Sequence, residues 1–265
     1  MPFLEENPVS NRLFLSLLLL LLGTALTATS AHAAYGARVC KQKPFKCHKV
    51  KKGESWASLF PSSHQREVAE RLNRRNTRLR PGQIIAIPKR PMTLEEISPF
   101  PSYITEKGRF NRVYVNQRKM AWGAYDAGGK LIKWGPISAG KGYCRDVKGG
   151  NCKTPFGSYT AFRKEGGGCE STAFPVGEGG APMPYCIFFN KGYALHGSPI
   201  VPGYNASHGC VRMYEKDARW LNYSFVELGG TKVVVTNKMP KRAPASQYKR
   251  PKSRFGEGIS SGWSH

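Results

Sequence analysis

The sequence predicts a mainly β fold: a β-sandwich or barrel with one helix, preceded by a small βααβ unit. Two observations support this for the larger region, residues 103–237. Short apolar runs there alternate with polar residues or are separated by turn signals, as in half-buried strands of all-β domains. Residues 215–228 instead space their apolar side chains three and four apart, which is typical of a helix.

The strands expected in the larger region follow one another closely. Residues 112–116 alternate apolar and polar side chains, and residues 119–125 follow a short turn as their hairpin partner. Gly229 and Gly230 are expected to end the helix. The other strands are expected at residues 130–138, 157–162, 186–190, 193–195 and 232–236.

Residues 47–88 form the smaller unit. A short strand and turn are expected at 49–53, helices at 55–59 and 66–72, and a closing strand at 83–88. Such a unit is small for an independent core, so a disulfide could staple it. A proline-rich linker follows at 89–102, and residues 238–265 form a basic tail with little to bury, which predicts disorder.

The N-terminus, residues 1–33, has the features of a secretory signal. The leucine-rich run at 13–22 is too short to span a bilayer comfortably, and the tripeptide 31–33 fits a signal-peptidase site. Glu5 and Glu6 are unusual in a signal, so an uncleaved N-terminal membrane anchor remains an alternative. Both readings predict export, to the periplasm or cell envelope.

Export favours disulfides among the seven cysteines, and an odd number leaves one unpaired unless it bridges two chains. Short loops close most readily, which favours Cys40–Cys47, Cys144–Cys152 and Cys169–Cys186. The alternative is that one or two of these are buried thiols. With these three pairings, Cys210 is left without a disulfide partner.

The formal net charge is +24, and removing residues 1–33, which hold two acidic residues and one arginine, leaves +25. Such a charge attracts polyanions. No nucleic-acid partner is expected, because the chain is exported and contains no nucleic-acid module. Anionic wall polymers or a membrane surface, reached through the basic tail, are the expected partners; a merely solvated surface is the alternative.

Two segments separated by eight residues carry the chemistry: Ala194-Leu195-His196-Gly197-Ser198 and Ser207-His208-Gly209-Cys210-Val211-Arg212-Met213. A cysteine attacks as its thiolate, and a nearby imidazole can take the thiol proton. Gly209 gives the backbone freedom to point N–H groups of Gly209 and Cys210 at a developing oxyanion. The alternatives are a turn with a buried thiol, or a zinc site using His196, His208, Cys210 and another cysteine. No metal-binding spacing supports the zinc site.

Residues 103–237 resemble the YkuD catalytic domain of the L,D-transpeptidases, over roughly half of the chain. The resemblance rests on His196, on the run from Ser207 to Arg212, and on Thr154-Pro155-Phe156-Gly157. It implies that Cys210 is the nucleophile and His196 the general base, without a metal or cofactor. It also implies that His208 and Gly209 belong to the catalytic site, and that the substrate-binding candidates are Ser198, Ser207 and Arg212.

The same resemblance implies a reaction on peptidoglycan. Cys210 would attack a tetrapeptide stem at its diamino acid, release D-Ala and pass the acyl group to an amine. The alternatives are an L,D-carboxypeptidase, with water as acceptor, or a catalytically silent wall-binding protein. Two departures from the family are a short loop between His196 and Ser207 and an insert at 163–184. The insert is expected to be a lid or substrate-binding loop.

The smaller unit resembles a LysM domain, a peptidoglycan-binding module. Residues 50–56 fit the N-terminal motif of that domain, and residues 79–88 fit its C-terminal motif. Asn76 lies near an asparagine that the domain is expected to have. The resemblance implies binding to the glycan strands of the wall. The alternative is a structural adaptor without affinity, because a fold does not establish a function.

Overall fold

The computed structural model describes residues 34–172, 175–177 and 180–247. The expected signal at 1–33 and most of the basic tail lie outside these residues. Within the described ranges, no helix is both long enough and apolar enough to cross a membrane.

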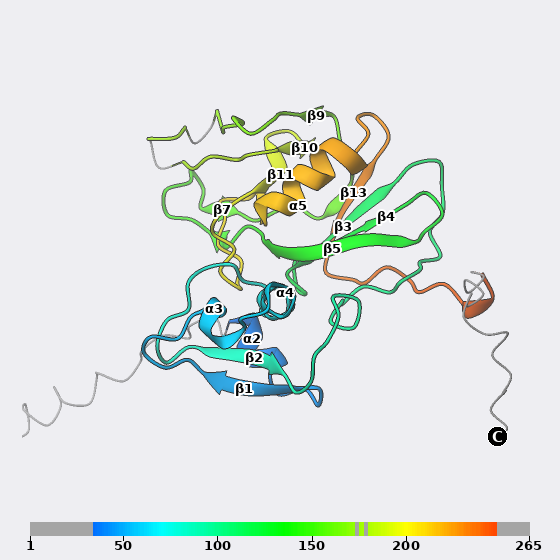
Figure 1. Cartoon of the computed structure of the whole chain (residues 1–265). Coiled ribbons are helices and arrows are strands. Elements are labelled where there is room, and N and C mark those ends of the chain that lie inside the picture. The colour runs from blue at the N-terminus through cyan, green and yellow to red at the C-terminus, as the bar shows by residue number, and fades with distance from the viewer. Residues whose placement is uncertain (1–33, 173–174, 178–179, 248–265) are drawn as a thin grey trace, which may run out of the picture. The chain divides into compact units, whose positions relative to one another are not determined.

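A nine-stranded mixed sheet forms the larger part of the fold (Figure 1). Its order is β8–β13–β3–β4–β5–β12–β11–β10–β9. Neighbours are antiparallel except β13–β3 and β11–β12, which are parallel. The strands are β3 Arg112–Asn116, β4 Ala121–Tyr125, β5 Leu131–Ser138, β8 Gly157–Thr160, β9 Arg163–Lys164, β10 Ile187–Asn190, β11 Tyr193–Gly197, β12 Val211–Met213 and β13 Lys232–Thr236.

The two edge strands of this sheet, β8 and β9, are consecutive in the sequence. Only Ala161 and Phe162 separate them, and both donate backbone hydrogen bonds, to Thr231 O and Phe188 O at 3.0 Å each. One stretch of chain therefore joins both edges, so the sheet curls into a half-barrel and leaves fewer unpaired edge groups. The predicted mainly β fold is confirmed.

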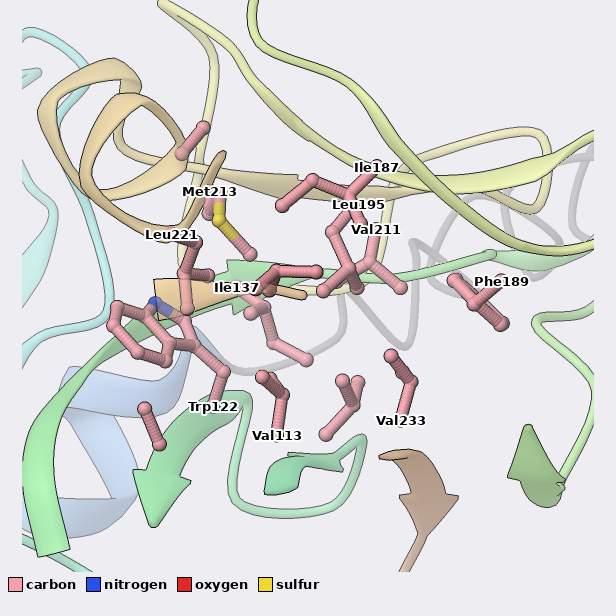
Figure 2. Packing of buried hydrophobic residues seen from close by; sticks show 14 of the residues in the cluster. Val113, Trp122, Ile137, Ile187, Phe189, Leu195, Val211, Met213, Leu221 and Val233 are labelled. Atoms are coloured by element: carbon pink, nitrogen blue, oxygen red, sulfur yellow. The ribbon is translucent and has the colours of Figure 1, made fainter. Parts of the chain in front are cut away.

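The core lies inside the curl, where side chains from several strands interdigitate (Figure 2). Trp122, Ile137, Leu195, Val211 and Met213 are all completely buried there. Burial on this scale excludes apolar surface from water, which is the main source of stability for such a sheet. The strands that carry the two candidate catalytic segments therefore belong to the rigid centre of the fold.

The expected helix is present, but it is shorter than predicted. Helix α5 spans Glu215–Trp220 and continues as a π-helical turn, Leu221–Phe225. Val226 is extended, with φ −87° and ψ 122°, and Leu228 is 48% exposed. Leu228 keeps the helical spacing in sequence but does not face the core, because the π turn shifts the register by one residue before the chain turns away.

The smaller unit has the predicted βααβ order: β1 Phe45–Lys49, α3 Trp56–Leu59, α4 Ser63–Leu72 and β2 Ile84–Pro88, with β1 and β2 antiparallel. A short helix that was not expected, α2 Tyr35–Val39, precedes it. The first strand lies four residues earlier than predicted. Residues 50–53 form a turn instead, because Gly53 adopts φ +85° and the Lys51 N–H donates to Glu54 at 2.8 Å.

The proline-rich segment expected as a linker is packed onto the sheet. Met92, Ile97 and Phe100 are buried in one apolar cluster with side chains such as Tyr125 and Trp134. Arg71 of α4 donates two hydrogen bonds to Asp217 of α5, at 2.8 and 2.9 Å, and both side chains are buried. The smaller unit therefore shares a buried contact surface with the sheet and its helix.

Candidate active site

The parallel pairing of β11 and β12 brings the two motif segments together. Leu195 pairs with Val211, and His196 pairs with Arg212. Cys210 immediately precedes β12 and lies two residues before Arg212, so the alternation of side chains along a strand places it on the same face of the sheet as Arg212 and His196. Both side chains line a pocket of about 320 Å³, together with Ser198, Ser207, His208 and Arg212.

His196 is fixed in one tautomer. Its side chain is 5% exposed, and Nδ1 lies 2.8 Å from the carbonyl oxygen of Gly197. Since a carbonyl can only accept, Nδ1 carries the hydrogen and Nε2 of the neutral ring is the acceptor. Burial lowers the pKa of His196 to about 4; the hydrogen bond to Gly197 opposes this shift, and Arg212 adds to it. His196 is therefore a neutral base at physiological pH.

Cys210 is the one cysteine outside the three disulfides. Its Sγ lies 3.6 Å from the carbonyl oxygen of Gly192. Burial raises the pKa of the Cys210 thiol, although a backbone hydrogen bond at Ala194 and the charge of Arg212 oppose the shift. The resting site thus pairs an un-ionised thiol with a neutral imidazole. The predicted pairings Cys40–Cys47, Cys144–Cys152 and Cys169–Cys186 are confirmed.

The turn that presents Cys210 requires a glycine at position 209 and is held in place by a hydrogen bond from Thr154. Gly209 adopts φ +134°, and a Cβ there would lie 2.7 Å from the Tyr193 ring. The buried hydroxyl of Thr154, from the TPFG turn, donates to the Gly209 carbonyl at 2.6 Å and accepts the Gly140 N–H at 2.9 Å. Thr154 therefore anchors the nucleophile's turn to the chain that follows β5.

Ser207 also shapes this turn. Its hydroxyl accepts the Gly209 N–H at 3.0 Å and donates to the Cys210 carbonyl. The Gly209 N–H, expected as an oxyanion-hole donor, is thus already used within the turn, and the Cys210 N–H remains the candidate. Ser198 is similar, since its hydroxyl accepts the Ile200 N–H at 3.1 Å. Both serines line the pocket, but their hydroxyls bond to their own loops.

Arg212 differs from the two serines. Its guanidinium lines the pocket and is partly buried, and within the described part of the chain it makes no hydrogen bond or salt bridge. Burial lowers its pKa, but the group stays charged because a guanidinium ionises so strongly. An unneutralised cation in a pocket is suited to binding a carboxylate.

A disulfide-closed hairpin forms one side of the pocket, and the sequence did not indicate it. Strands β6 Gly142–Tyr143 and β7 Asn151–Cys152 pair there. The turn between them carries Asp146, whose carboxylate lies 2.7 Å from Nε2 of His208. Val147 and Asn151 of this hairpin line the pocket.

The insert forms another side. Its described residues Ser171, Gly180, Ala181, Pro182 and Met183 line the pocket. The Cys169–Cys186 disulfide fixes it close to β10, which begins at Ile187. This placement agrees with a substrate-binding loop.

Two groups of potential metal ligands lie within the described residues. One joins Cys144, Asp146 and His208, and the other joins Glu165 with Cys169 and Cys186. All three cysteines are in disulfides, and a disulfide sulfur is not the thiolate that zinc binds.

The fold and site together define a curled, mainly β domain in which a cysteine and a histidine from neighbouring parallel strands share a pocket. Residues 110–235 match the YkuD family, described as the L,D-transpeptidase catalytic domain. The chain therefore carries an L,D-transpeptidase catalytic domain of the YkuD type at these residues. Among curated proteins, none matches the chain.

Several solved structures are similar to the chain at low identity. An L,D-transpeptidase from Xylanimonas cellulosilytica is 24% identical, with a TM-score of 0.48, over 65% of this chain and 79% of that one. One from Stackebrandtia nassauensis is 24% identical, with a TM-score of 0.40, over 52% and 60%. L,D-transpeptidase 3 from Mycobacterium tuberculosis is 18% identical, with a TM-score of 0.39, over 59% and 76%.

Proposed function

We propose that this protein is a peptidoglycan L,D-transpeptidase that forms an acyl-enzyme on Cys210. The observation that carries the proposal is the single free thiol, which shares a pocket with a histidine whose Nε2 is left as proton acceptor. The family of residues 110–235 supports acyl transfer as the reaction class.

In the proposed reaction, His196 Nε2 takes the thiol proton while Sγ of Cys210 attacks the carbonyl of the stem's diamino acid. The Cys210 N–H stabilises the oxyanion, as preorganised donors do in acyl transfer. The imidazolium then protonates the leaving amine, D-Ala departs and a thioester remains. An acceptor amine attacks the thioester, His196 removes its proton, and the free thiol is restored.

Arg212 is proposed to bind a carboxylate of the donor stem. Arg212 lines the same pocket as Cys210 and lies two residues after it, so a bound carboxylate would place the scissile bond close to the sulfur. Arginine suits this role because it can bind a carboxylate with two parallel hydrogen bonds.

The partner is peptidoglycan, and the site of action is the exterior of the cell, in the periplasm or envelope. The βααβ unit is proposed to contact the glycan strands, as its resemblance to a LysM domain suggests. The basic tail is proposed to add attraction to anionic wall polymers or a membrane surface.

The intact mass of the purified, oxidised protein after incubation with a carbapenem tests the proposal. Wild type is expected to gain one adduct, and Cys210→Ala none. A second incubation with a disaccharide-tetrapeptide separates the acceptors: cross-linked dimers identify transpeptidation, and tripeptide alone identifies a carboxypeptidase. Wild type that gains no adduct and leaves the tetrapeptide intact would contradict the proposal and favour a wall-binding protein.

A further inference from the structure

The segment 198–206 links the two candidate catalytic residues, since it joins the end of β11 to the turn of Cys210. On the sheet side it is tied to the end of β5. The Ser138 hydroxyl donates to the Tyr204 carbonyl at 2.8 Å and accepts the Ala206 N–H at 3.0 Å. The Ala139 N–H donates to the side chain of Asn205 at 3.0 Å.

The opposite side of the same segment is tied to the βααβ unit through Asn76. The Asn76 N–H donates to the Val201 carbonyl at 3.1 Å, and its side-chain oxygen accepts the Val201 N–H at 2.8 Å. Its side-chain nitrogen donates to the Ser198 carbonyl at 3.3 Å. Arg75 and Pro202 form an adjacent β-bridge.

The contact is close as well as specific. A Cβ on Gly203 would lie 3.1 Å from the backbone oxygen of Asn73, and the Gly203 carbonyl accepts the Tyr35 N–H at 3.0 Å. The end of α4 and the start of α2 therefore both touch the segment. Two elements outside the YkuD match, which begins at residue 110, thus support a loop inside it.

Asn76 is linked to His196 by a short path. The Gly197 carbonyl, which fixes the tautomer of His196, belongs to the peptide that leads into Ser198. The Ser198 N–H on that peptide donates to Met213 O at 2.9 Å, and the Ser198 carbonyl accepts from Asn76. The peptide that orients the base is therefore held by β12, and the next peptide along the chain, which contains the Ser198 carbonyl, is held by the βααβ unit.

We propose that Asn76 is a positioning residue of the active site, and that the βααβ unit completes that site by clamping the connection between His196 and Cys210. The inference rests on the proposed function only in taking these two residues as the reacting pair. The structural role of the unit is then separate from any affinity for glycan.

The test compares Asn76→Ala and Asn76→Asp with the control Ser62→Ala. Asn76→Ala removes both side-chain bonds, whereas Asn76→Asp keeps an acceptor for Val201 and loses the donor to Ser198. Ser62 is the N-cap of α4 and accepts from Gln65, so its loss destabilises the same unit without touching the segment. Melting temperature is recorded for each variant.

Three probes report on Cys210. Carbapenem acylation tests the natural reaction class, and 4-nitrophenyl acetate tests acyl transfer to the Cys210–His196 pair whatever the natural substrate. Iodoacetamide tests access to the thiol without an oriented base. Both Asn76 variants are expected to lose about 10- to 100-fold in acylation by the first two probes, because small misplacements of a catalytic group cost about that much. Their alkylation by iodoacetamide is expected to stay near wild type.

Ser62→Ala is expected to melt at a lower temperature but to be acylated at the wild-type rate. Acylation rates of the Asn76 variants that match Ser62→Ala would overturn the inference. A rise in their iodoacetamide rate would also overturn it, because that indicates a loosened pocket rather than a misplaced base. If Asn76→Ala does not fold, Asn76→Asp decides alone. Failure of the carbapenem on wild type, with 4-nitrophenyl acetate still active, would count against the proposed function only.

Discussion

His196 and Cys210 occupy environments that keep both side chains uncharged at neutral pH. Burial disfavours the charged form of each, lowering the pKa of the imidazole and raising that of the thiol. A resting thiol is less readily oxidised than a thiolate, which would protect Cys210 if the chain is exported as proposed. In the proposed reaction, the thiol proton must therefore move during attack on the acyl donor.

The expected pH dependence follows from these directions. Iodoacetamide alkylation of Cys210 should rise with pH and reach half its maximum above the ordinary thiol value of about 8.5, because only the thiolate reacts. The rate of acylation by a carbapenem should fall to half as the pH drops to about 4, rather than already near 6.5, since His196 accepts a proton only while neutral. Stopped-flow rates from pH 3.5 to about 10 check both. A plateau of alkylation extending below pH 7 would indicate a preformed ion pair and contradict the prediction.

Among the elements, the β6–β7 hairpin has the most direct effect on the pocket. It is held by Cys144–Cys152, carries Asp146 against His208, and contributes Val147 to the lining. A two-stranded hairpin with strands this short is not stable by itself. The disulfide supplies that stability by restricting the open conformations of the hairpin.

Removing this disulfide with Cys144→Ser and Cys152→Ser is expected to raise the KM for a tetrapeptide stem several-fold. The wall of the pocket loosens, while the turn that holds Cys210 keeps its bonds to Thr154. Steady-state kinetics measure the change. Cys40→Ser with Cys47→Ser is the matched control, because it opens a loop of similar length in the βααβ unit. Equal KM effects in both double variants would contradict a role for the hairpin in binding.

For the whole molecule, the Arg71–Asp217 pair connects the βααβ unit to the helix behind the active site. The Arg71 guanidinium also donates to the Trp134 carbonyl at 2.8 Å and to Glu67 at 2.8 Å. With the two bonds to Asp217, it makes four hydrogen bonds. A buried ion pair of this kind contributes little net stability relative to apolar residues, but breaking it leaves a buried charge. The pair therefore specifies how the two parts of the described chain fit together.

Arg71→Met is expected to lower the free energy of unfolding by about 3–5 kcal/mol, because it leaves the Asp217 carboxylate buried with only Lys133 nearby. Adding Asp217→Leu should recover part of that loss, since the orphaned charge is removed. Urea unfolding of the single and double variants measures both. Glu67→Ala, which breaks a partly exposed contact, should cost less than about 1 kcal/mol. A double variant as unstable as the sum of its parts would contradict this account.

The sequence alone was sufficient for features that depend on local pattern. Strands 112–116 and 232–236 were predicted with the observed bounds, because the alternation in the first and the short apolar run in the second are both local properties of the sequence. The three disulfides were predicted because short loops close readily, and that left Cys210 as the free thiol. The roles of Cys210 and His196 in catalysis stay predictions.

Only the tertiary structure decided which distant residues support that pair. Asp146 and His208 are 62 positions apart, and Arg71 and Asp217 are 146 apart. Asn76 contacts Val201 across 125 positions. No periodicity or spacing marks such partners, because each contact exists only once the sheet has curled and the βααβ unit has packed against it. The sequence thus determined the chemical groups of the site, and the packing of separate elements determined how they are oriented.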